Sequence, residues 1–378
     1  MALSQVGLER LNTATTKKIG TNKNIIINGA MLVAQRSTDI TTGNAGVHCV
    51  DRIDGESTNA DEAPRRQQVD VSSTSTPYTL GFRKAFKLTN GNQTSGAGVD
   101  DIMNIRYNIE SQDISQSGWN YKSASSFVTL QFWIKSSVSQ NFNMYLRTRD
   151  GTNQTYAFDT GTLSADTWTK ITKTIPGNSN IQLDNDNGQG LQLNFGPFWG
   201  TNRTDNSVNN EEWKTYASAS RMKDNATTWY TTDNATFEIT GVQLELGSNA
   251  SPFQFETAAE TLQKCQRYCQ VIKMQNGDYS GFIGIAQGAA DASIMRTFPV
   301  PFRDEPTYTG SATSMRMQAG DVSNTVNFNA LSIYRVPTQR PVATIGLRDS
   351  NIGSMTAGQV LLLMAMANNG KMTFDSEI

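Results

Sequence analysis

Apolar and polar residues alternate with a period of two through several stretches of the chain. The clearest stretch is 127–135, in which every even position is apolar, and similar patterns occur at 142–147, 171–175 and 191–195. Because successive side chains of a strand point to opposite faces, the pattern predicts strands with one face in a core. Turn-forming clusters separate the stretches and no helical pattern intervenes. We therefore predict an all-β fold, and for this region a jelly-roll β-sandwich.

The stretch 236–246 shows the same alternation with one slip. Phe237 and Ile239 follow one phase, whereas Val242 and Leu244 follow the other. The change of phase at Thr240 and Gly241 predicts a β-bulge within a single strand.

A different period appears at 257–271. Apolar residues recur there at spacings of three and four, and Thr257 with Glu260 fits a capping box. The apolar positions are Leu262, Cys265, Tyr268, Cys269 and Ile272. The pattern predicts a short amphipathic helix that links two β domains, with an apolar stripe suited to packing on symmetry mates.

The predicted helix divides the chain. Residues 24–256 form the jelly-roll domain, and residues 272–378 form a second small β-sandwich domain. The strands predicted in the second domain are 282–286, 294–300, 331–336, 342–345, 360–367 and 371–374. Of these, 360–367 is a continuous apolar run, which predicts a strand buried on both faces.

Residues 1–23 are a separate segment. Leu3, Val6, Leu8 and Leu11 predict one or two amphipathic turns, followed by a polar linker. Two interpretations stay open: a docking peptide that orders on a larger assembly, and a frayed terminus.

Composition excludes several kinds of partner. Charged residues make up 17% of the chain and the formal net charge is −2, so no basic stripe for nucleic acid is present. The longest apolar run is far shorter than the ~20 residues of a membrane span, and the first residues lack the apolar core of a secretory signal. We expect a chain that is made in the cytoplasm, does not insert into membranes, and leaves the cell by lysis.

Little in the sequence indicates catalysis. His48 is the single histidine, and its neighbour Cys49 would point to the opposite face of a strand. The odd number of cysteines predicts small buried side chains and no disulfide framework. Acids such as Asp100 and Asp101 are sequence neighbours, which does not supply the carboxylate pair about 5–9 Å apart that glycoside hydrolysis needs. We expect neither an enzyme nor a cofactor.

Aromatic residues in polar surroundings are the candidate binding residues. Such rings stack on sugar faces or fill protein interfaces. The candidates are Trp199, Trp213, Trp229 and Tyr230 in the polar segment 196–234, and Trp133, Tyr145 and Arg147 on the second face of the predicted strands. The alternatives are that the loop aromatics plug the ends of the sandwich and that the second face is covered or contacts a subunit.

Several motifs carry a family resemblance. Residues 24–36 (NIIINGAMLVAQR), 239–252 (ITGVQLELGSNASP) and 262–270 (LQKCQRYCQ) resemble motifs of bacteriophage tail-fibre-like proteins. Shorter matches stand at 50–52 (VDR), 129–136 (TLQFWIKS) and 298–307 (FPVPFRDEPT). Ile53 replaces the tryptophan usual after the VDR element, and Cys269 stands where tyrosine is usual. The resemblance covers nearly the whole chain from Asn24.

The resemblance implies a carbohydrate-binding-module-like jelly roll, a homotrimer, a place on the virion, and attachment to host surface polysaccharide. Residues 1–23 would then dock onto other virion proteins of the tail or the head. A structural calcium ion is common in such jelly rolls, and Asp51 and Glu245 are conceivable contributors.

Three functions follow from this combination. The leading one is a virion fibre protein that binds a host-receptor glycan. The alternative is a structural connector or head-decorating fibre protein with no ligand of its own, and the least favoured is a polysaccharide depolymerase.

Overall fold

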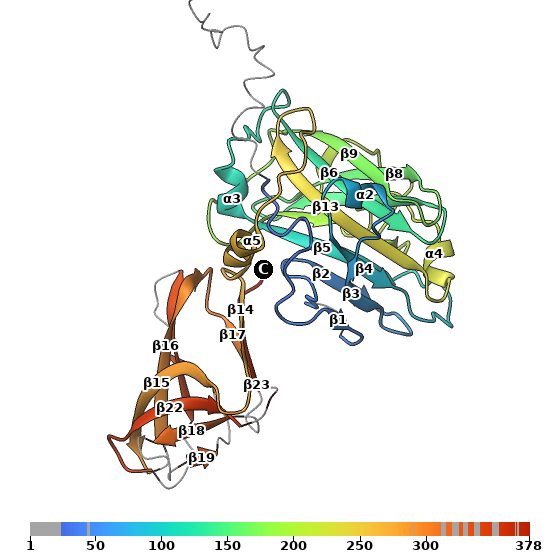
Figure 1. Ribbon diagram of the computed structural model, residues 1–378. Helices are drawn as coiled ribbons and strands as arrows, with labels where there is room; N and C mark the ends of the chain where they lie inside the picture. The colour runs from blue at the N-terminus through green and yellow to red at the C-terminus, as the bar shows by residue number, and fades with distance from the viewer. Residues whose placement is uncertain are drawn as a thin grey trace, which may run out of the picture. The chain divides into compact units, whose positions relative to one another are not determined.

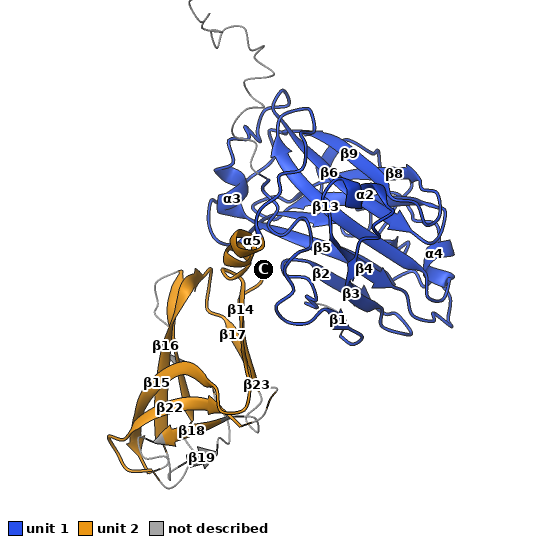
Figure 2. Ribbon diagram, in the orientation of Figure 1, with its two compact units in different colours: residues 1–257 blue, residues 258–378 orange. Residues whose placement is uncertain are grey.

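The computed structural model describes residues 24–43, 46–289, 291–310, 315–319, 325–327, 332–335, 341–349, 355–366, 368 and 370–378. The segment 1–23, with Leu3, Val6, Leu8 and Leu11, lies outside these residues. The chain divides into two compact units, 1–257 and 258–378 (Figure 2). Antiparallel strands dominate both units, which confirms the all-β fold class.

Unit 1 contains a six-stranded and a seven-stranded antiparallel sheet (Figure 1). The six-stranded sheet has the order β1 (Asp39–Ile40), β3 (Arg65–Asp70), β4 (Lys84–Thr89), β13 (Thr236–Leu246), β6 (Phe127–Ser136), β9 (Thr169–Pro176). The seven-stranded sheet has the order β11 (Phe198–Trp199), β5 (Ile102–Glu110), β10 (Gln189–Asn194), β7 (Asn141–Thr148), β8 (Gln154–Thr162), β12 (Trp213–Thr215), and β2 (Asp54–Thr58) also pairs with β5. The short helices are α2 (Thr76–Thr79), α3 (Ser111–Ser115) and α4 (Thr228–Thr231).

The core of unit 1 lies between these sheets. The even positions of β6 are fully buried, as the alternation predicts, and they are Val128, Leu130, Phe132 and Ile134. Phe132 meets Phe195 edge to face with ring centroids 5.0 Å apart, and Phe142 meets Phe237 in the same way. Such aromatic pairs contribute beyond the area that they bury, and they hold the two sheets together.

The predicted bulge in β13 is confirmed. The pairing of β13 with β6 shifts register between Thr240 and Gln243. Gly241 has φ +64°, and a Cβ atom there would lie 2.7 Å from Cζ of Phe82. Both the backbone angle and the close approach of the ring therefore require glycine.

Unit 2 begins with helix α5 (Ala258–Cys265) and continues with two sheets. The three-stranded sheet has the order β14 (Cys269–Met274), β23 (Gly370–Asp375), β17 (Thr307–Gly310). The seven-stranded sheet has the order β19 (Thr325–Asn327), β18 (Met315–Ala319), β22 (Val360–Ala365), β15 (Tyr279–Gly288), β16 (Asp291–Phe302), β21 (Val342–Asp349), β20 (Ser332–Arg335). Unit 2 has a hydrophobic core of its own, which contains Phe282, Phe298, Phe302 and Phe374.

The helix is shorter than predicted, since it ends at Cys265 and not at Val271. Cys269 begins β14, and it pairs with Asp375 of β23. The pairing with β23 gives this segment ladder hydrogen bonds, which outweigh its helical periodicity. Cys265, Tyr268 and Cys269 are fully buried within the chain, so this part of the predicted stripe is not available to symmetry mates.

Two further expectations concern burial. Cys49, like the other cysteines, is free and buried, which confirms its interpretation as a small core residue. The strand 360–367 is not buried on both faces, because Val360 is 56% exposed while Leu361 and Leu363 are buried. Within the described residues, no helix is long and apolar enough to span a membrane.

Candidate ligand-binding face

Two of the predicted aromatics lie deep in unit 1. Trp229 and Tyr230 of α4 are fully buried in its main core. Tyr230 stacks on Phe198 at 4.3 Å, and Trp229 Nε1 donates to the Thr236 carbonyl at 3.0 Å. These rings close the sandwich, so the prediction that they contact a ligand or another subunit is wrong.

Trp199 and Tyr145 are also buried, being 3% and 2% exposed. They meet edge to face at 5.6 Å on the outer side of the seven-stranded sheet. Trp213 is half-buried; its ring lies 5.2 Å from that of Tyr156, and its Nε1 donates to the Pro176 carbonyl at 2.7 Å. The rings of Trp199, Tyr145 and Trp213 therefore support the sheet, and none presents an open stacking platform.

Trp133 does not share a face with Tyr145 and Arg147. It belongs to β6 of the six-stranded sheet, whereas the other two belong to β7 of the seven-stranded sheet. Trp133 packs in an outer cluster with Phe82 and Ala85, which is separate from the main core. The core of unit 1 lies between these two outer faces, so Trp133 and Arg147 cannot contact one ligand ring.

The outer face of the seven-stranded sheet is strongly polar, and we call it the polar face. Its residues come from β2, β5, β10, β7 and β8, and they are Asp54, Glu56, Asn104, Arg106, Asn108, Gln192, Asn194, Arg147 and Thr155. The register brings them together across strands, since Gln192 lies opposite both Asn108 and Arg147. Only Arg147 was predicted as a site residue. The other residues occupy the outward-facing polar positions of their strands, which the sequence does show. The sequence does not show that these strands are neighbours, so it could not group the residues into one site.

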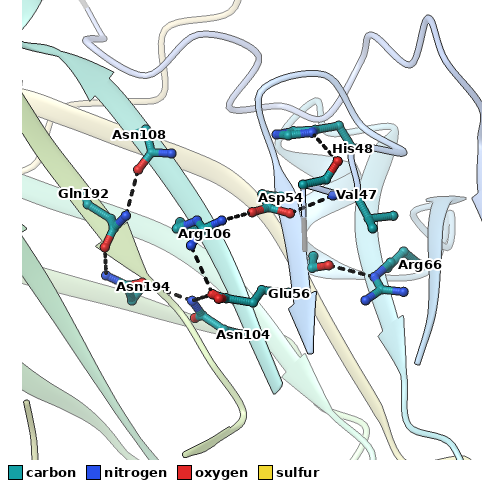
Figure 3. A network of polar contacts seen from close by, with 12 residues as sticks. Val47, His48, Asp54, Glu56, Arg66, Asn104, Arg106, Asn108, Gln192 and Asn194 are labelled. Carbon is teal, nitrogen blue, oxygen red and sulfur yellow. Dashed lines mark hydrogen bonds and ion pairs between the residues drawn. The ribbon is translucent and has the colours of Figure 1, made fainter. Parts of the chain in front are cut away.

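Amide side chains form a connected row along the polar face (Figure 3). Gln192 Nε2 donates to Asn108 Oδ1 at 3.0 Å, and Asn194 Nδ2 donates to Gln192 Oε1 at 3.4 Å. Asn104 Nδ2 donates to Asn194 Oδ1 at 3.0 Å. Each amide is oriented by its neighbour. The four side chains are 0–6% exposed, so the row is a buried network beneath the surface of the polar face.

Acids lie at the β2 side of the polar face, next to Arg106 (Figure 3). Arg106 forms ion pairs with Asp54 and, at 3.2 Å, with Glu56. Burial lowers the pKa of Arg106, but these two carboxylates outweigh it and the net pKa is raised. Asp54 also accepts from the Val47 amide at 2.9 Å. Both acids are thus engaged in holding Arg106.

The segment 200–226 covers one end of the polar face. Asn143 donates from its backbone to Asn225 Oδ1 at 2.9 Å and from Nδ2 to the Asp224 carbonyl at 2.8 Å. The amide of Glu211 donates to the Ala157 carbonyl at 2.7 Å. The segment predicted to carry exposed aromatics therefore folds back on the sheet.

The same segment places two side chains beside β7. Cζ of Arg147 lies 3.5 Å from the ring centroid of Tyr216, and Cζ of Arg221 lies 4.6 Å from that of Trp199. Tyr216 and Arg221 are half-buried, in contrast to Trp199. Tyr216 is thus the partly exposed ring of the polar face, and sequence reasoning missed it.

Several polar atoms on or beside the polar face are buried without a hydrogen-bond partner in the described structure. They are Asn104 Oδ1, Arg106 Nε, Trp199 Nε1 and Arg221 Nε. Buried polar groups normally find partners, and such exceptions call for an explanation such as water or a ligand. These four atoms are themselves buried, so they lie beneath the surface that a ligand would meet.

The conceivable calcium contributors are held by protein groups. Asp51 accepts from the Gln35 amide at 2.9 Å, and Glu245 accepts from the amide of Ser251 at 2.7 Å and Gln243 Nε2 at 3.0 Å. Within the described ranges, no three His, Cys, Asp or Glu residues are grouped so as to hold a metal ion.

His48 and Cys49 do not form a reactive pair. His48 Nδ1 lies 3.2 Å from the Gly46 carbonyl oxygen, and burial raises the pKa of the Cys49 thiol to about 12. The thiol is therefore protonated at neutral pH, and a protonated thiol is a poor nucleophile.

A separate polar pocket of about 360 Å³ opens at the end of the sandwich. Thr215 and Gln154 of this pocket pair across β12 and β8, on the same side as Trp213 and Tyr156. It therefore does not open on the polar face.

Comparisons with known proteins find structural similarity at low identity. No protein-family model matches the chain, and no curated protein does. The tripod from the baseplate of bacteriophage Tuc2009 is 12% identical with a TM-score of 0.29, covering 92% of this chain and 90% of that chain. The enzymatically active domain of tailspike protein 4 of bacteriophage CBA120 is 11% identical with a TM-score of 0.31, covering 59% of this chain and 21% of that chain. The N-terminal cellulose-binding domain of Cellulomonas fimi β-1,4-glucanase C is 11% identical with a TM-score of 0.27, covering 52% of this chain and 88% of that chain. Similarity at this level does not assign a function to the chain.

Proposed function

We propose that this chain is a bacteriophage virion fibre protein that binds a host surface polysaccharide through the polar face. The observation that carries the proposal is the half-buried ring of Tyr216, which lies beside the guanidinium groups of Arg147 and Arg221 on a sheet face lined with polar side chains. Sugars present hydroxyl groups that both donate and accept, and apolar ring faces that stack on aromatic rings. The resemblance of the sequence to tail-fibre-like proteins supports the same function.

A pair of matched variants tests this site. Tyr216→Ala removes the half-buried ring of the polar face. Tyr78→Ala removes a comparable ring on the other side of unit 1, where Cζ of Arg83 lies 3.9 Å from the Tyr78 centroid. Calorimetry with surface polysaccharide from a susceptible host should show roughly tenfold weaker binding for Tyr216→Ala and unchanged binding for Tyr78→Ala. Equal affinities for all three proteins would rule out the polar face as the site.

We propose further that the chain acts as a homotrimer through an exposed apolar patch of unit 2. The patch lies on the outer face of the seven-stranded sheet and comprises Tyr279, Ile283, Ile285, Met295 and Val360, each 50–57% exposed. Ile283 lies opposite Met295, and Ile285 lies opposite Val360, so the side chains are neighbours across three strands. Contiguous exposed apolar patches mark interaction sites.

Other copies of the same chain are the partner that fits this patch. At the rim, Asp291 pairs with Arg348, Gln287 and Thr297 are uncharged, and Arg316 of β18 lies opposite Met364. The centre of the patch is apolar, and an identical copy offers a matching apolar centre around a symmetry axis.

A structural connector or head-decorating protein without a ligand is the second candidate. The burial of Trp229, Tyr230 and Trp199 favours it, because these rings serve the fold itself. In both cases residues 1–23 would dock onto other virion proteins of the tail or the head. The connector predicts no binding to host polysaccharide by the purified chain.

We also propose that the chain binds polysaccharide without cleaving it. On the polar face, Asp54 and Glu56 are both engaged with Arg106. Incubation with host polysaccharide should release no reducing ends, whereas a steady release would establish a depolymerase.

A further inference from the structure

We infer that the glycan bound at the polar face is anionic, and that Arg147 and Arg221 bind its carboxylate or phosphate groups. The inference rests on the proposed glycan-binding function and adds the chemical class of the ligand. It is carried by the two guanidinium groups and by the distribution of charge across the seven-stranded sheet.

Both guanidinium groups lie against aromatic rings. Cζ of Arg147 is 3.5 Å from the Tyr216 centroid, and Cζ of Arg221 is 4.6 Å from the Trp199 centroid and 5.7 Å from that of Tyr216. A guanidinium stacked on a ring is held in a fixed plane, and Nη1 of Arg147 takes no part in the contact with Asn153. Such planar, preorganised donors match the two oxygens of a carboxylate or phosphate.

Neither arginine has an acidic partner among the residues that the structure describes. Arg147 donates through Nε and Nη2 to the Asn153 amide oxygen at 3.2 and 2.7 Å, in the amide orientation that satisfies both groups. Arg221 Nε is buried without a partner. Other arginines differ, since Arg106 pairs with two acids and Arg65 pairs with Asp39.

The charges of the polar face are separated. Asp54 and Glu56 lie on β2 beside Arg106 of β5, at one edge of the sheet. Arg147 of β7 lies opposite Thr155, which in turn lies opposite Lys214 of β12 at the other edge. Asp54 and Glu56 are therefore separated by β10 from the cations near β7 and β12, whereas Asp159 of β8, which accepts from Asn210, and Asp205 lie on the same side as these cations.

Burial makes this positive region costly in the absence of an anion. Burial and, after it, the nearby Arg149 lower the pKa of Arg147. Burial also lowers the pKa of Lys214, and Asp205 offsets this only in part. A half-buried charge without a counter-charge destabilises the protein, and an anionic ligand would remove that cost.

The test uses the full chain and surface polysaccharide from a susceptible host in three forms: native, with carboxylates reduced to alcohols, and with phosphates removed. We expect native polysaccharide to bind, rising salt to weaken binding, and one of the two treatments to abolish it. That treatment identifies the source of the charge. Arg147→Gln and Arg221→Gln should each weaken binding about tenfold or more, whereas Arg83→Gln should not change it.

The outcomes separate the two proposals. The anionic inference is overturned if both treated forms bind as well as native polysaccharide and the two arginine variants bind like wild type. If Tyr216→Ala still weakens binding in that case, the glycan site itself stands. If wild type binds none of the three forms, the proposed glycan-binding function fails and the anionic inference fails with it. Unchanged tryptophan fluorescence of the variants controls for folding, because all six tryptophans lie in unit 1.

Discussion

Arg66 is a fully buried arginine that is held by neutral acceptors. It donates to the Gly55 carbonyl at 2.8 Å, the Pro64 carbonyl at 3.0 Å and Ser57 Oγ at 3.2 Å (Figure 3 shows the first of these). Burial lowers the pKa of Arg66. The side chain therefore joins β2 to β3, which belong to different sheets, and its sequence neighbour Arg65 is exposed.

Arg66→Ala should destabilise unit 1 by about 3–5 kcal/mol, because it leaves buried acceptors unpaired and a cavity behind. Arg65→Ala is the matched control and should cost much less, since an exposed ion pair contributes little to stability. Urea unfolding followed by tryptophan fluorescence measures both. Similar losses for the two variants would contradict the structural role of Arg66.

Several buried groups make the stability of unit 1 sensitive to alkaline pH, because burial raises the pKa of Tyr145 and Tyr230 as well as those of Cys49 and Tyr156. Burial raises the pKa of Cys49 to about 12, and burial with the charge of Glu211 raises the pKa of Tyr156 to about 12. The native state thus holds both protons more tightly than the unfolded chain, whose values are about 8.5 and 10. The corresponding stability is complete below the unfolded pKa values and is lost as pH rises towards 12.

Urea midpoints of unit 1 should therefore fall as pH rises from about 8 to 11. Cys49→Ala removes one of these groups, so the midpoint of the variant should fall less steeply over this range. An identical slope for wild type and variant would show that the thiol is not buried as described.

The local sequence pattern predicted where strands occur better than it predicted which strands pair with one another. The alternation of 127–135 predicted β6 and its buried face, and the slip at Gly241 predicted the bulge of β13. The pattern could not tell that β6 pairs with β13 and β9, because strand partners are set by contacts between distant residues. For this reason Trp133 and Arg147 were assigned to one face, although they lie on different sheets.

The sequence predicted the type of candidate site but not most of the residues that form it. A polar face with aromatic and arginine residues on the second phase of the strands was expected, and Arg147 belongs to it. Tyr216 and Arg221 come from a segment without periodicity, and their position depends on how 200–226 folds back on the sheet. Burial of Trp229 and Tyr230 likewise depends on tertiary packing, which local polarity does not reveal.

Gly241→Ala should destabilise unit 1 by about 1–3 kcal/mol, because it combines a positive φ with a contact to Phe82. Gly247 has φ +104°, and a Cβ atom added there would meet nothing within 4 Å, so Gly247→Ala tests the backbone effect alone. Urea unfolding should show the larger loss for Gly241→Ala. A larger loss for Gly247→Ala would show that the Phe82 contact is unimportant.

For the whole molecule, assembly depends on the apolar patch of unit 2. Ile283→Lys combined with Ile285→Lys places two charges at its centre, and light scattering should change from the mass of a trimer to that of a monomer. Thr309→Lys adds a charge at an exposed position of β17 in the three-stranded sheet, away from the apolar patch, and should leave the trimer intact. A double variant that remains trimeric, or a monomeric wild type, would contradict the proposed interface.

The central claim is that a glycan binds to the outer face of the seven-stranded sheet in unit 1. The most direct measurement is a structure of the chain in complex with an oligosaccharide derived from the surface polysaccharide of a susceptible host. The account predicts sugar density over β7 and the segment 200–226, in contact with Tyr216, Arg147 and Arg221. Density on the outer face of the six-stranded sheet near Trp133, or in the pocket at the end of the sandwich, would contradict it.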